Sequence, residues 1–291
     1  MLGSSKMINL DQVRDCLDRG WIVLAPNHRL CPQVNLLEGP IKDCRDLLSW
    51  VYDGGLERFI GSSYSESCNL DLEHVFAFGT SSGGSLALSL VSHDPWNRRL
   101  RGDGGDVNNV QGYGVPRLVA GIFNMYGPCD FANECWTQKI AQMKLPSHLI
   151  SDFMNKVYEE DPVPIEGGVS LEGQANGPPD FSDPRQAFAL SQVANGSVMD
   201  AVYPSRKWEE VDPLLNINSG FPPTYIVHGG ADTKVPKQLS QKLYQELQDF
   251  GVQCGMSEAP GEEHTFAAKM EVGSSTWDIQ RRGFDFLQRL I

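Results

Sequence analysis

The sequence predicts an α/β fold in which helices flank a mostly parallel sheet of about five strands, with residues 1–291 forming a single domain. Short, continuous apolar runs bounded by Gly, Pro or polar residues recur along the chain, as expected for strands buried on both faces of a parallel sheet. Segments with apolar residues at helical spacing alternate with these runs, which is the order of βαβ units. The length of 291 residues is sufficient for one large domain of this kind.

The first half of the chain supplies most of these alternating elements. Residues 9–19 predict a helix because Leu10, Val13 and Leu17 recur at helical spacing, and Gly20 is a suitable C-terminal stop. The apolar run that follows predicts a strand buried on both faces. The expected elements, in chain order, are a helix over 9–19, a strand over 21–26, a helix over 40–52, a polar linker over 61–71, a strand over 75–78, a helix that fades near 93–95, a loop over 101–115 and a strand over 118–125.

The second half interrupts the alternation and then resumes it. Residues 130–208 contain a Gly/Pro-rich span and mixed helical patterns, and an insertion of this length is typical of a lid. Its aromatic side chains are expected either to line a pocket or to form the lid's own core. Regular structure returns as a strand over 222–228, a helix over 236–250, a strand over 253–258 and a final helix over 275–291.

Composition excludes several partner classes. The net charge of −13 argues against nucleic acid or an anionic membrane as the main partner. No apolar run approaches the ~20 residues needed to cross a bilayer, and residues 1–10 lack the features of a signal peptide. The seven cysteines are scattered and never form Cys-x-x-Cys, which favours reduced thiols. We therefore expect a cytoplasmic protein that uses no metal and no cofactor.

A Gly-x-Ser-x-Gly pattern at residues 79–83 follows the apolar run 75–78. A strand, a tight turn and a helix would place Ser81 in strained backbone, with the Ser82 amide directed toward a developing oxyanion. We expect both glycines to be required for the close approach of strand and helix. The alternative is a glycine-rich helix entry that holds an ordinary buried serine.

Ser81, Asp232 and His264 each follow a different predicted parallel strand, in that order along the chain. The carboxyl ends of parallel strands share one edge of the sheet, so these side chains are expected to meet. Serine needs an adjacent base to become a nucleophile, and a carboxylate fixes the tautomer of the histidine that serves as that base. The order Ser, Asp, His is that of α/β-hydrolases. We expect His28 and His228 to support loops.

Five motifs resemble those of one family. Residues 27–32 (Asn-His-Arg-Leu-Cys-Pro) resemble Asn-Tyr-Arg-Leu-Ala-Pro, and residues 79–84 (Gly-Thr-Ser-Ser-Gly-Gly) resemble Gly-Asp-Ser-Ala-Gly-Gly. Residues 212–214 resemble Ser-Pro-Leu, residues 228–232 resemble His-Gly-x-x-Asp, and residues 261–266 resemble Gly-x-x-His-x-Phe. The chain is thus similar to the hormone-sensitive-lipase-like carboxylesterases, of the α/β-hydrolase fold-3 type. The resemblance implies that Ser81 is the nucleophile, Asp232 the acid and His264 the base.

The family also has a His-Gly-Gly-Gly motif whose amides complete the oxyanion hole, and this sequence begins where that motif should end. We expect the chain to be N-terminally short relative to a complete hydrolase and to retain only the Ser82 amide of the hole.

The expected function is hydrolysis of a small or medium carboxylic ester through an acyl-enzyme. The alternative is a weakened relative that binds a small molecule without efficient turnover. The sequence identifies neither the substrate-binding residues nor the oligomeric state.

Overall fold

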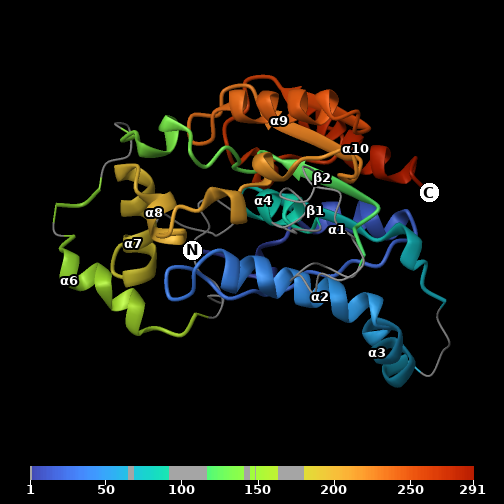
Figure 1. Cartoon of the computed structure of the whole chain (residues 1–291), viewed down its shortest axis with the longest axis horizontal. Coiled ribbons are helices and arrows are strands. Elements are labelled where there is room, and N and C mark those ends of the chain that lie inside the picture. The colour runs from blue at the N-terminus through green and yellow to red at the C-terminus, as the bar shows by residue number, and fades with distance from the viewer. Residues whose placement is uncertain (1, 65–68, 92–116, 141–144, 148, 163–179) are drawn as a thin grey trace, which may run out of the picture.

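The computed structural model describes residues 2–64, 69–91, 117–140, 145–147, 149–162 and 180–291 (Figure 1). Within them lies a four-stranded parallel sheet in the order β1-β2-β3-β4. Its strands are β1 (Phe76–Thr80), β2 (Gly121–Met125), β3 (Thr224–Gly229) and β4 (Cys254–Ala259). The α/β class and the parallel sheet are confirmed, with four strands described rather than about five.

Each face of the sheet carries its own hydrophobic core, because successive side chains along a strand point to opposite sides. Ile122 and Ile226 contribute to the core shared with α2 (Lys42–Tyr52), α4 (Ser82–Leu88) and α9 (Lys237–Asp249). Phe123 and Val227 contribute to the core shared with α1 (Leu10–Asp18) and α10 (Ser275–Gln288). The continuous apolar runs of the sequence reflect burial on both faces.

The predicted helices over 9–19, 40–52, 236–250 and 275–291 are present with bounds close to those expected. Asn9 caps the first helix by accepting hydrogen bonds from two backbone amides, and Ser274 caps the last. The helices outside the 130–208 segment are α1 (Leu10–Asp18), α2 (Lys42–Tyr52), α3 (Gly55–Tyr64), α4 (Ser82–Leu88), α9 (Lys237–Asp249) and α10 (Ser275–Gln288).

The predicted strand over residues 21–26 is wrong. This segment is extended but has no place in the sheet, where β1 pairs only with β2. Trp21 and Val23 pack against the core beneath α10, while Ile22 and Leu24 are 51% and 42% exposed. An apolar run indicates an extended segment that can pack, but a strand also needs a hydrogen-bonding neighbour, which local sequence does not reveal.

The predicted polar linker over residues 61–71 is also partly wrong, because α3 extends through Tyr64. Residues 65–68 lie outside the described part of the chain, as does the predicted loop over 101–115. The predicted helix end near 93–95 is wrong, because the helix that follows β1 ends at Leu88, with Ser89 as its C-terminal cap.

The 130–208 segment contains α6 (Ser151–Met154), α7 (Pro184–Asn195) and α8 (Val198–Val202), which lie together at one end of the molecule (Figure 1). The buried Asp212 carboxylate accepts hydrogen bonds from the amides of Asp130 and Phe131, at 3.0 and 2.6 Å. The two ends of the segment are thereby tied together beside the sheet.

None of the helices in the described ranges is long and apolar enough to span a membrane.

Candidate active site

Ser81 occupies a strained turn between β1 and α4. Its φ is 50° and its ψ is −124°, a backbone conformation that residues other than glycine rarely adopt. The helix approaches the strand so closely at this turn that a Cβ on Gly79 would lie 2.1 Å from the Gly83 carbonyl. Gly79 is therefore required for the approach that holds Ser81 at the end of the strand.

The expected role of Gly83 in this approach is wrong. A Cβ on Gly83 would meet no heavy atom within 4 Å, whereas one on Gly84 would lie 2.2 Å from Asn124 Oδ1. The close contact falls at Gly84 rather than at Gly83 because β2, which carries Asn124, lies beside that part of α4. A sequence motif alone does not show which side of a helix meets the neighbouring strand.

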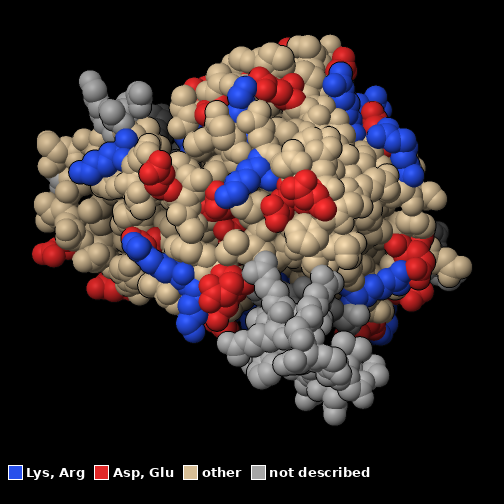
Figure 2. All heavy atoms as spheres, turned by 45° about the horizontal axis from the view of Figure 1, so that its top comes forward, with Lys and Arg blue, Asp and Glu red and all other residues tan. Residues whose placement is uncertain are grey.

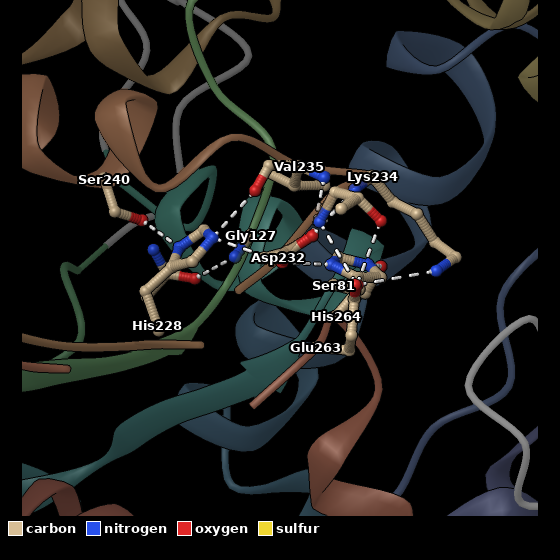
Figure 3. Close-up of polar contacts among 11 residues, drawn as sticks. Ser81, Gly127, His228, Asp232, Lys234, Val235, Ser240, Glu263 and His264 are labelled. Atoms are coloured by element: carbon tan, nitrogen blue, oxygen red, sulfur yellow. Dashed lines mark hydrogen bonds and ion pairs between the residues drawn. The ribbon is translucent and has the colours of Figure 1, made fainter. Parts of the chain in front are cut away.

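Two consecutive hydrogen bonds connect Ser81 to His264 and His264 to Asp232 (Figure 3). Ser81 Oγ lies 2.8 Å from His264 Nε2, and His264 Nδ1 lies 2.7 Å from Asp232 Oδ2. The Asp232 carboxylate accepts a hydrogen bond from Nδ1–H, which leaves Nε2 to accept one from the serine hydroxyl. The ring of Tyr126 packs edge-on against the His264 ring, with centroids 5.0 Å apart, and restricts its orientation.

Asp232 is fully buried and fully occupied as an acceptor. Its Oδ1 accepts from the amides of Lys234 and Val235, both at 2.9 Å, so the carboxylate also holds the turn after β3. Burial by itself raises the pKa of Asp232, but hydrogen bonds from His228 and His264 outweigh it and hold that pKa well below its ordinary value. The group is therefore a permanent anion at neutral pH.

His228 is a member of this network that the sequence reasoning did not place there. Its Nε2 lies 3.2 Å from Asp232 Oδ2 and 2.8 Å from the Val235 carbonyl oxygen (Figure 3). Because both neighbours are acceptors, the proton resides on Nε2, and Nδ1 accepts from Ser240 Oγ at 2.7 Å. The only available signal was the position of His228 at the end of the strand that leads to Asp232.

Replacing His228 with phenylalanine is expected to lower the free energy of unfolding by about 2 kcal/mol, the typical worth of a hydrogen bond to a charged group. We expect kcat/KM for an ester to fall about tenfold, since 1.4 kcal/mol corresponds to a factor of ten and Asp232 keeps its two amide donors. Chemical denaturation and steady-state kinetics measure the two effects. Ser240→Ala is the matched control, because it removes the partner of Nδ1 but leaves the contact with Asp232; an equal loss in both variants would contradict the positioning role of His228.

Ser82 is the first residue of α4, so its amide is one of the N-terminal donors with no partner within the helix. Ser4 lies in the wall of the same pocket as Ser81, and Ser4 Oγ is buried with no hydrogen-bond partner among the described residues. Ser4 and Ser82, from two separate parts of the chain, thus both belong to the wall of the pocket.

The space itself is a pocket of about 580 Å³ lined by Ser81 and His264. This volume is typical of small-molecule sites. Its walls come from the sheet edge, the N-terminal residues and the 130–208 segment, which contributes apolar side chains that include Phe131, Trp136 and Met199. Other aromatic residues of that segment, such as Tyr203, pack into a core instead, so both expected uses of its aromatics occur.

No group of three or more metal-binding side chains occurs in the part of the chain that the structure describes.

Comparisons with curated proteins find relatives that are much longer than this chain. The chain is 27% identical over 300 residues to "Non-reducing polyketide synthase Preu6" of Preussia isomera, covering 98% of this chain and 13% of that protein. It is 25% identical over 315 residues to "Methylphloroacetophenone synthase" of Cladonia uncialis, covering 98% of this chain and 12% of that protein. The chain thus spans only a small part of the length of these relatives.

Two solved structures share the fold. A Staphylococcus aureus protein of unknown function matches with a TM-score of 0.61 and 19% identity, covering 100% of this chain and 85% of that one. A truncated carbohydrate esterase from gut microbiota matches with a TM-score of 0.51 and 18% identity, covering 94% and 76%. A sequence model of the BD-FAE family matches residues 3–166, more than half of the chain. The chain therefore belongs to the BD-FAE family, within the α/β-hydrolase superfamily.

Proposed function

We propose that this protein is a serine hydrolase that cleaves a small or medium carboxylic ester through an acyl-enzyme on Ser81. The observation that carries the proposal is the hydrogen-bonded chain from Ser81 through His264 to Asp232, opening into a pocket of about 580 Å³. Segment 130–208 is proposed to act as the lid of this pocket, since it supplies part of the wall.

In the proposed first half-reaction, Ser81 Oγ attacks the ester carbonyl carbon while its proton passes to His264 Nε2. The negative charge that develops on the carbonyl oxygen is stabilised by the Ser82 amide. When the tetrahedral intermediate collapses, the imidazolium gives its proton to the departing alkoxide, which leaves as the alcohol. Asp232 stabilises the imidazolium and holds the ring in place.

In the second half-reaction, water attacks the acyl carbon and its proton passes to His264 Nε2. Collapse of the second intermediate returns that proton to Ser81 Oγ and releases the carboxylic acid. The same two steps apply to a thioester, since a thiolate is a better leaving group than an alkoxide. The similarity to non-reducing polyketide synthases makes polyketide esters and thioesters the first substrates to test.

A fluorophosphonate probe tests the proposal directly, because it reacts with serines activated by a neighbouring base. We expect the folded wild-type protein to be labelled at Ser81 and the His264→Gln variant to be labelled at least about 10²-fold more slowly, the usual contribution of general-base catalysis. Peptide mass spectrometry locates the adduct, and circular dichroism checks the fold of the variant. No labelling of well-folded wild-type protein would instead support a relative that binds a small molecule without turnover.

A further inference from the structure

Of the described lysine, aspartate and glutamate side chains, those that line the pocket are all cationic. Among the described residues that line it there is no aspartate or glutamate, whereas Lys139 and Lys234 are both present. This contrasts with the chain as a whole, whose net charge is −13. It also contrasts with the face in Figure 2, where acidic and basic side chains are interspersed. A pocket with only cationic side chains in an acidic protein favours an anionic ligand.

Lys139 extends from a fixed piece of backbone. The amide of the next residue, Ile140, donates to the Ala194 carbonyl at the end of α7, at 3.0 Å. Gly196 packs so closely beneath this segment that a Cβ there would lie 2.5 Å from the Thr137 carbonyl carbon. The Lys139 ammonium makes no ion pair with any described residue, so its charge is available to a ligand.

Lys234 is the weaker candidate of the two. It lies in the turn that follows Asp232, and its ammonium is 3.8 Å from Glu263 Oε2 (Figure 3). Glu263 also accepts hydrogen bonds from Thr233 and is held in place beside the lysine. The charge of Lys234 is thus partly compensated within the protein, whereas that of Lys139 is not.

The rest of the wall requires a largely apolar ligand. Trp136, Ile140 and Val193 also line the pocket. Trp136 and Ile140 are close to Lys139 in the sequence, and Val193 lies on α7, where the Ala194 carbonyl accepts from the Ile140 amide. A ligand that matches both features has an apolar or aromatic body and a single anionic group. We propose that the ester taken by this pocket carries such a group, of which a carboxylate is the simplest, and that Lys139 selects for it. The part of this inference that concerns an ester rests on the proposed function, whereas the preference for an anionic group does not.

Equilibrium binding tests the inference without turnover. The probes are 4-acetylbenzoate and its neutral isostere 4-acetylbenzamide, titrated calorimetrically into the wild-type protein. We expect the anion to bind about fivefold more tightly, the scale of a solvent-exposed ion pair, and the preference to shrink in 0.5 M NaCl. In Lys139→Met the preference should vanish, and in Lys139→Glu it should reverse. Lys269→Glu is the control, because it makes the same charge change at an exposed lysine outside the pocket lining.

The matching kinetic test compares kcat/KM for 4-acetoxybenzoate and 4-acetoxybenzamide. Retained hydrolysis with no preference for the anion, or an equal effect of Lys139→Glu and Lys269→Glu, overturns the inference and leaves the proposed function intact. If neither ester is hydrolysed in a Ser81-dependent way while anion binding still depends on Lys139, the proposed function is overturned and the preference for an anionic ligand is supported. Equal binding of anion and amide by the wild-type protein sinks the inference whatever the kinetics show.

Discussion

Replacing Ser81 with alanine is expected to lower kcat/KM for an activated ester by at least about 10⁴-fold. The substitution removes the oxygen that attacks the carbonyl but leaves His264 and Asp232 in contact with each other. The Cβ is retained, so the turn at φ 50° is expected to persist. Steady-state hydrolysis of a nitrophenyl ester measures the loss, with circular dichroism and thermal unfolding as checks on the fold.

Two companion variants sharpen this result. Ser82→Ala keeps the backbone amide that is proposed to face the oxyanion, so its kcat/KM should stay within a few-fold of wild type. Ser81→Gly should be as inactive as Ser81→Ala yet about 1 kcal/mol more stable, because glycine relieves the strained backbone at this position. Turnover that survives in Ser81→Ala would assign the nucleophile elsewhere.

Replacing Asp232 with asparagine is expected to lower kcat by about 10³–10⁴-fold. An asparagine oxygen cannot serve all four donors that surround the carboxylate, because the amide group itself brings N–H donors. One orientation places the amide nitrogen against His264 and His228, and the other places it against the two backbone amides. The control is Asp15→Asn, a buried aspartate paired with Arg19 and Arg281 away from the pocket, which should lose stability but keep kcat within a few-fold.

The difference in stability between the wild-type protein and Asp232→Asn is also expected to depend on pH. The pKa of Asp232 in the folded protein lies below its ordinary value of 3.8, so the unfolded chain takes up the proton first as the pH falls. The stability that the carboxylate contributes is fully present above about pH 5 and declines as the pH falls below 3.8 toward the folded-state pKa. The difference in unfolding free energy between wild type and Asp232→Asn should therefore be constant at neutral pH and narrow below pH 4, as measured by urea denaturation at a series of pH values. A difference that widens on acidification would contradict the assigned direction.

The fold was predictable from the chain because the two central strands of the sheet, β2 and β3, are buried on both faces. Burial makes β2 and β3 continuous apolar runs, and such runs are visible without any knowledge of their neighbours. Residues 21–26 show the same pattern with a different outcome: one side packs on the core, the other faces solvent, and no strand pairs with them. Pairing is a property of two segments, so a single segment cannot report it.

Some residues of the site could likewise be identified from the sequence and others could not. Ser81, Asp232 and His264 could be chosen from the sequence because each follows a predicted strand, and parallel strands end at a common edge. The second imidazole on Asp232 could not be chosen, because His228 lies within a strand and its ring direction depends on how α9 packs above it through Ser240. The pocket charge is likewise invisible in a chain of net charge −13.

Local sequence is enough to predict the α/β class, the strand-turn-helix around Ser81 and the order in which a serine, an aspartate and a histidine follow strands. These are local features, set by apolar periodicity and by the backbone conformations that glycine permits. Folding sets the remaining features: which edge of the sheet has a neighbour, which glycine meets β2, how His228 holds Asp232 and how Lys139 comes to line the pocket. Each of these depends on contacts between residues far apart in the chain, and the free energy of such contacts depends on a geometry that exists only after folding.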